Sequence, residues 1–181
     1  MKYPNFIYLF ILLTVFSCST FEKFDHFGIG NTFEESFEVD IPFSNNMSFL
    51  GSVEFAASDD ATIQDNIDNI QEFEVTQISL KITNYVGNSG AVGNGSFMIT
   101  SNGNSVGDAV QVSNLNFTQL FASEELMELP LTQATYNAIE TAYRANETLT
   151  IEASGEISGA TENLQIEFTV YMSIEATIGS Q

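Results

Sequence analysis

Residues 164–178 read LQIEFTVYMSIEATI, with an apolar residue at every even position and, in between, residues that are polar or carry a hydroxyl group. Successive side chains of a β-strand point to opposite faces, so this period of two predicts a long strand with one buried face. Such alternation is typical of antiparallel sheets that have one face on a core and the other in water. The stretch therefore decides the fold class, which we expect to be all-β and mainly antiparallel.

The segment before this strand repeats the pattern. Apolar residues between 149 and 157 alternate with Glu152, Ser154 and Glu156, and residues 159–163 (GATEN) separate the two runs. A short polar connection between two alternating runs predicts an antiparallel hairpin. Shorter alternating segments occur at 37–41, 53–55, 78–82, 97–99, 110–112 and 127–131.

Two segments have the period of a helix instead. Ile63, Ile67 and Ile70 are spaced by four and three residues, which predicts a helix over 61–71. A second helix is predicted over 132–145, with Thr132 as its N-cap. Together these elements predict a two-sheet β-sandwich, immunoglobulin-like or jelly-roll, with one or two short helices.

Glycine is concentrated in residues 87–95, and the following strand together with the lack of a nearby lysine argues against a phosphate-binding loop. We interpret the segment as a flexible connection with a tight turn at Asn94-Gly95, and we place the next turn at 102–104. Loops at the end of a sandwich can carry recognition, but the sequence does not choose among them.

The N-terminus has the form of an export signal. Lys2 precedes an apolar run from Phe6 to Phe16. As a helix, about eleven residues cover roughly 16 Å, which is well short of the ~30 Å hydrocarbon core of a bilayer. A run of this length favours a cleaved signal rather than a membrane span.

The sequence Val15-Phe16-Ser17-Cys18 resembles the lipobox of bacterial lipoproteins. The resemblance implies that Cys18 becomes the mature N-terminus and carries a diacylglyceryl thioether and an N-acyl chain, which together anchor a protein stably. Ser19 in place of Asp would favour the outer membrane in that family. The alternative is an ordinary signal peptide with a chance cysteine. We expect a lipoprotein signal peptide at 1–17, a lipidated cysteine and tether at 18–32, and a single domain at 33–181.

Charge excludes one class of partner. The chain has 24 acidic residues against four basic ones, and cleavage before Cys18 would remove Lys2. Nucleic-acid binders need clustered Lys and Arg to displace counterions, so we expect no nucleic-acid partner. An acidic surface keeps a tethered domain soluble, or else it attracts a cation or a basic partner.

The chain offers few residues for catalysis. His26 is the only histidine and Cys18 the only cysteine, which argues against a serine-type relay and a zinc site. A glycosidase with a carboxylate pair is the enzyme alternative, but neither Glu34-Glu35 nor Glu124-Glu125 is marked as special. We therefore expect no enzyme, and we assign no catalytic or cofactor-binding residue.

Oxygen ligands are plentiful, so Ca²⁺ is the cofactor to consider. Asp59, Asp60, Asp65 and Asp68 are the candidate ligands, although their spacing is not that of an EF-hand. The competing interpretation is that residues 58–60 cap a helix whose polar face carries the other acids.

These observations predict an exported, lipid-anchored lipoprotein of the cell envelope, in the outer membrane, that acts as a binding or accessory structural module. Its partners would be the membrane, through the lipid, and an envelope protein. The alternatives are a calcium-dependent adhesion domain and a carrier that holds an apolar small molecule between its sheets.

Overall fold

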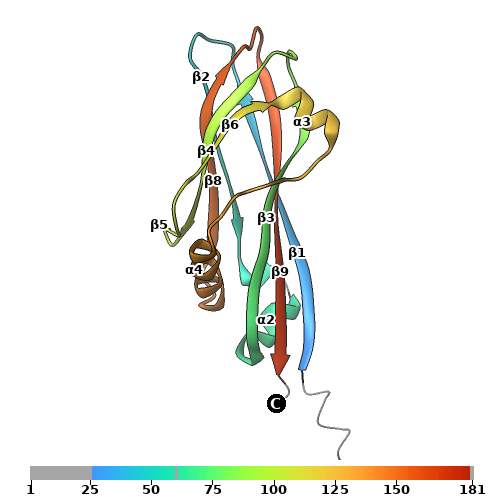
Figure 1. The fold of residues 1–181 in the computed structure, drawn as a ribbon, viewed down its shortest axis with the longest axis vertical. Coiled ribbons are helices and arrows are strands. Elements are labelled where there is room, and N and C mark those ends of the chain that lie inside the picture. The colour runs from blue at the N-terminus through green and yellow to red at the C-terminus, as the bar shows by residue number, and fades with distance from the viewer. Residues whose placement is uncertain (1–25, 60, 180–181) are drawn as a thin grey trace, which may run out of the picture.

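The computed structural model describes residues 26–59 and 61–179 (Figure 1). The strands are, in chain order, β1 (His26–Ile41), β2 (Met47–Phe55), β3 (Ile70–Val86), β4 (Val92–Ser101), β5 (Asn104–Ser105), β6 (Val110–Asn116), β7 (Met127–Glu128), β8 (Leu149–Ser158) and β9 (Leu164–Gly179). The helices are α2 (Ala61–Asn66), α3 (Phe117–Ser123) and α4 (Gln133–Arg144), and 3₁₀ turns flank α2 at Ala57–Asp59 and Ile67–Asn69.

The strands form two packed antiparallel sheets, as predicted. One sheet has the order β1-β9-β3-β7, and the other has the order β2-β8-β4, with β5 and β6 both paired to β4. The pairs are nested along the chain: β1 pairs with β9, β2 with β8, β3 with β7 and β4 with β6. A chain folded as one long hairpin and then rolled up has this pairing, so the sandwich is a jelly roll rather than immunoglobulin-like.

The predicted hairpin of the last two strands is wrong. β8 lies between β2 and β4, whereas β9 lies between β1 and β3 in the other sheet, so residues 159–163 cross from one sheet to the other. Alternation shows which face of a strand is buried, and both strands do bury the predicted face. The alternation of apolar and polar residues does not specify which strand is the hydrogen-bonded neighbour.

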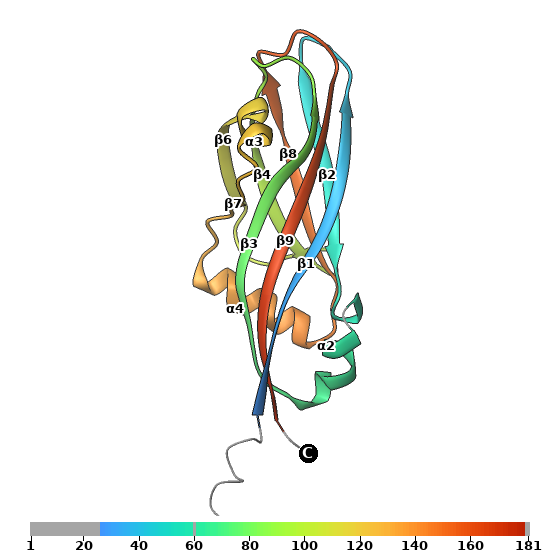
Figure 2. The same cartoon turned by 90° about the vertical axis from the view of Figure 1, so that its right-hand side faces the viewer.

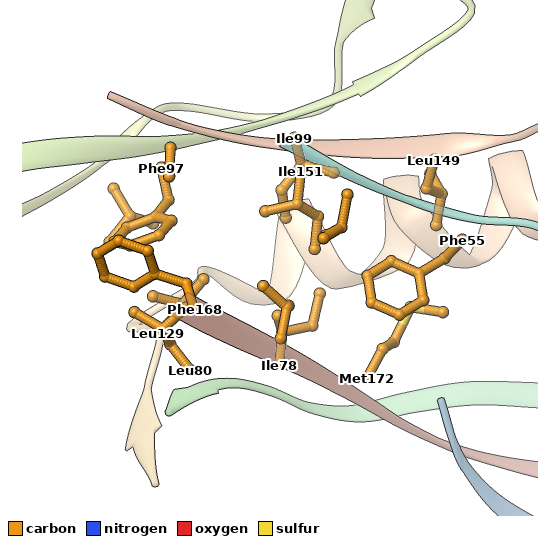
Figure 3. Packing of buried hydrophobic residues seen from close by; sticks show 14 of the residues in the cluster. Phe55, Ile78, Leu80, Phe97, Ile99, Leu129, Leu149, Ile151, Phe168 and Met172 are labelled. Carbon is orange, nitrogen blue, oxygen red and sulfur yellow. The ribbon is translucent and has the colours of Figure 1, made fainter. Parts of the chain in front are cut away.

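Aromatic rings fill the space between the sheets. Phe168, in the first half of β9, is fully buried and stacks on Phe37 and Phe49 at centroid distances of 5.2 and 5.8 Å. Phe117 of α3 meets it edge-on at 6.4 Å. In Figure 3, side chains of β4 and β8 point toward those of β3 and β9, which is how two facing sheets share one core.

The two long sides of the sandwich differ. On one side, the helices α3 and α4 both pack against β3. Between these two helices, β7 pairs with β3 through only two residues (Figure 2). Below β7, the Val75 N–H donates instead to Glu140 Oε1 of α4, 3.1 Å away. On the other side lie β1 and β2, each paired on one edge only among the described residues. The crossover between β6 and β8 thus covers one side and leaves the other free.

The helices agree with the sequence to different degrees. The second predicted helix is confirmed as α4, and Thr132 Oγ1 accepts a hydrogen bond from Thr135 N at its start. The first is confirmed but ends early, because β3 already begins at Ile70. Helix α3 was not predicted; Asn116 caps it by accepting a bond of 2.9 Å from the Gln119 N–H.

The interpretation of the glycine-rich segment is partly wrong. Gly93, Asn94 and Gly95 lie inside β4 and form no tight turn. A Cβ on Gly93 would stand 2.4 Å from the ring of Phe117, so this glycine makes room for an aromatic side chain. The turn at 102–104 is confirmed: Asn102 and Gly103 have φ of 50° and 76°, as a tight two-residue hairpin requires.

Strand β1 begins at His26, so the sheet starts within the predicted tether of residues 18–32. The start of β1 and the end of β9 lie side by side at one end of the long axis (Figures 1 and 2). None of the helices in residues 26–59 and 61–179 is long and apolar enough to cross a bilayer.

Candidate binding surface at the loop end

Three loops gather at the end of the sandwich opposite the start of β1 and the end of β9. They are residues 42–46 between β1 and β2, residues 87–91 between β3 and β4, and residues 159–163 between β8 and β9 (Figure 1). We refer to them together as the loop end. The jelly-roll topology places them there because each connects strands of different sheets at the same end.

Asparagine side chains tie these loops to one another. Asn163 Oδ1 accepts from the Phe43 N–H at 2.8 Å, which joins the first loop to the third. Asn88 Nδ2 donates to Gly159 O at 2.9 Å, and Asn88 Oδ1 accepts from the Thr161 N–H at 2.9 Å, which joins the second loop to the third. These bonds fix the three loops relative to one another.

A close backbone approach reinforces these bonds. Gly159 has φ of 71°, and a Cβ at this position would lie 2.2 Å from the carbonyl oxygen of Gly90. Only glycine fits a left-handed conformation with another backbone in that space.

Tyr85 of β3 is hydrogen-bonded to the second loop. Its hydroxyl donates to Asn88 O at 2.6 Å. Burial raises the pKa of the Tyr85 phenol, and the negative charge of Glu162 adds to this shift. The phenol therefore stays protonated around neutral pH, and its hydrogen bond to the loop persists.

The loop end exposes apolar side chains. Phe43 is 54% exposed and Val86, at the end of β3, is 56% exposed. Large apolar side chains on rigid loops suit contact with another macromolecule.

The four aspartates proposed as calcium ligands lie in and around α2. Asp59 Oδ2 accepts from the Ala56 N–H at 2.8 Å, so its carboxylate closes the 3₁₀ turn that precedes α2. Asp65 lies in α2 and Asp68 in the following 3₁₀ turn, both exposed, and Asp60 is outside the described residues. Across residues 26–59 and 61–179, no three His, Cys, Asp or Glu side chains gather as a metal site would require.

Acidic side chains do line a groove near the chain ends. Glu72, Glu74, Glu140 and Glu175 border a space of about 440 Å³ between β3, β9 and α4. Glu74 stands directly opposite Glu175 in the β3–β9 pairing. One of the four is engaged, since Glu140 accepts from Val75 N. The sequence did not predict this groove, because its residues come from strands whose partners could not be assigned.

The remaining candidates of the sequence are scattered. Cys18 is outside the described residues, and His26 is the first residue of β1. Glu34 and Glu35 lie on β1, far along the chain from Glu124, which follows α3 with its carboxylate 4.0 Å from Lys81 Nζ.

The rings that a carrier would use to line a cavity are packed against one another. Phe33 meets Phe55 at 6.5 Å and Tyr143 at 5.9 Å, and Phe73 stacks on Tyr143 at 5.1 Å. Such contacts are those of a close-packed interior.

No family model and no curated protein matches the chain. Similar solved structures include Desmodium yellow mottle tymovirus (7% identity, 83% of this chain and 84% of that chain, TM-score 0.36) and tobacco necrosis virus (9%, 78% and 95%, 0.29). A third is the 60-mer BFDV capsid protein (7%, 86% and 95%, 0.35). At these TM-scores the fold assignment rests on the strand pairing of the chain itself.

Proposed function

We propose that this chain is a lipid-anchored lipoprotein of the cell envelope, in the outer membrane, and that its jelly-roll domain is a binding or accessory structural module rather than an enzyme. One observation of the fold supports this proposal above the others: the start of β1, at His26, and the loop end lie at opposite ends of the long axis (Figure 1). A lipid at Cys18 would therefore hold the domain by one end and present the other end to a partner.

The length of chain between anchor and domain fits this arrangement. Seven residues, 19–25, separate Cys18 from the first residue of β1. Fully extended, they reach at most about 25 Å. The domain would thus stay close to the membrane, and the loop end would be the part farthest from it.

The loop end has the properties of a contact surface. It is fixed by Asn88 and Asn163, and it exposes Phe43 and Val86. In contrast, the acidic candidates for catalysis lie on separate elements. Binding through the loop end is the activity that these side chains support best.

The test is partner capture in intact cells. The tagged protein would be cross-linked and gently solubilised, and co-purifying proteins would be identified by mass spectrometry. We expect a near-stoichiometric envelope protein that is lost with Phe43→Ser and kept with Leu126→Ser. The control is matched in exposure, since Leu126 is 53% exposed, but it lies beside β7 rather than at the loop end.

Anchoring is tested in parallel with Cys18→Ser. We expect this variant to leave the membrane fraction and to lose the partner. Membrane association that survives the substitution, or equal capture by the Phe43 and Leu126 variants, would contradict the proposal.

A further inference from the structure

The outer edge of β1 lies on the side of the sandwich away from α3 and α4, where β2 of the facing sheet comes close to β1 but does not pair with it. Its other edge pairs with β9 through sixteen consecutive residue pairs, from His26 opposite Gly179 to Ile41 opposite Leu164, in a single register. Among residues 26–59 and 61–179, no strand pairs with the outer edge of β1. Half of its backbone N–H and C=O groups thus face outward, as in any edge strand.

Edge strands are templates for the addition of another strand, and proteins usually blunt them by shortness, proline, bulges or charge. β1 is sixteen residues long and keeps one register throughout, and Pro42 comes only after its last residue. Of these features, β1 has only negative charge.

The charges form a row. Glu34, Glu38 and Asp40 share the outer face of β1 and are exposed. Alternate residues of a strand are about 6.6 Å apart, so with Ser36 these side chains form an evenly spaced row along the edge. Glu35 shares the face of Phe33 and Phe37 and is nevertheless exposed.

Neighbouring residues of the sheet add to this charge. Glu38 stands directly opposite Glu167, and like charges in this position repel. The basic side chains of the described residues have contacts elsewhere: Lys81 Nζ lies 4.0 Å from Glu124, and Arg144 donates to Gln71 O. A cationic side chain beside β1 would relieve the repulsion.

The same charges limit which strand could pair with the outer edge of β1. A second copy of the chain paired edge to edge would bring two acidic rows together. An extended segment with a basic residue at every second position would instead place each cation over the outer face, beside Glu34, Glu38 or Asp40. Backbone pairing would supply affinity, and the spacing of the charges would supply selectivity.

We propose that the free edge of β1 binds an extended segment of a partner protein that carries Lys or Arg at every second residue, added as a further strand of the sheet. This deepens the proposed function and rests on it in taking the domain to be a binding module. It assigns a surface and a class of partner segment that are separate from the loop end.

The experiment uses the full-length lipidated protein in detergent and two labelled dodecapeptides of six Lys and six Thr. One alternates Lys and Thr, and the other has the six Lys in one block. At low ionic strength we expect the alternating peptide to bind about tenfold more tightly than the block peptide, and N-methylation of its backbone to abolish binding.

The variant that tests the surface is Glu34→Gln/Glu38→Gln/Asp40→Asn. We expect it to bind the alternating peptide about tenfold more weakly. The control, Asp108→Asn/Glu125→Gln/Glu156→Gln, removes the same charge from exposed residues on other elements and should bind as the parent does.

Absence of binding, equal affinity for the two peptides, or equal loss in the two variants would overturn the inference. These outcomes differ from failure of the proposed function, because the peptide assay depends on neither the anchor nor Phe43. A partner captured in cells together with a failed peptide assay would leave the proposed function standing and remove only the strand addition.

Discussion

At the residue scale, glycine has two different uses in this chain. Gly103 has a positive φ and makes a tight turn, as its neighbours Asn102 and Asn104 suggest. Gly93 lies in a strand and makes room for a ring of the core. The local sequence is similar in both places, and only distant residues distinguish them: Phe117 packs on Gly93, and Gly95 pairs with Gly155 of β8. This is why the turn at 102–104 could be predicted and the turn at Asn94-Gly95 was wrong.

Gly155 provides a test of the second use. A Cβ here would lie 2.4 Å from the carbonyl oxygen of Asn94 and 2.6 Å from the ring of Phe49. We expect Gly155→Ala to lower the free energy of unfolding by about 1–3 kcal/mol, because overpacking forces the ring or the strand to move. Urea denaturation would measure it.

The matched control is Gly28→Ala, at a site where a Cβ would meet nothing within 4 Å. Equal stability of the two variants would show that sheet and ring adjust without strain.

At the element scale, local signals predicted whether a segment is a helix or a strand. The predictions that failed are those of which strands pair. α4 was predicted within one residue at either end because its cap and apolar stripe are local features. The buried face of β9 was likewise predicted. The neighbours of β8 and β9 were not, because residues far away in the chain, in β1, β2, β3 and β4, compete for the same edges.

The cap of α4 gives the prediction at this scale. Thr132 Oγ1 accepts from the Thr135 N–H at 3.2 Å, and Thr132→Ala would leave that donor without its acceptor. We expect a loss of about 1 kcal/mol in the free energy of unfolding. Thr132→Ser keeps the hydroxyl and should keep most of the stability in the same denaturation assay. A serine variant as unstable as the alanine variant would argue against the cap.

At the scale of the whole molecule, charge works against compactness. The net charge is −20, and the fold places Glu38 opposite Glu167 and Glu74 opposite Glu175. Self-repulsion of this kind destabilises a folded state and is screened by salt. The large aromatic core offsets it.

Salt therefore tests the role of this charge. Raising NaCl from about 0.01 to 0.15 M shortens the Debye length from about 30 to 8 Å. We expect stability to rise by about 1 kcal/mol, or a Tm increase of about 2–4 °C, in thermal melts. CaCl₂ at equal ionic strength should raise the Tm no further than NaCl does. A clear additional rise with calcium would favour the calcium-dependent adhesion alternative and would direct attention to the groove lined by Glu72, Glu74, Glu140 and Glu175.

The sequence by itself determined the all-β class, the buried face of the strands, the position of α4 and the acidity of the chain. These properties depend on hydrophobic periodicity and on residue chemistry, which are local. Only the tertiary structure decided the jelly-roll pairing, the loop end held by Asn88 and Asn163, and the free edge of β1. Each of these depends on contacts between segments far apart in the chain, and such contacts leave no local pattern.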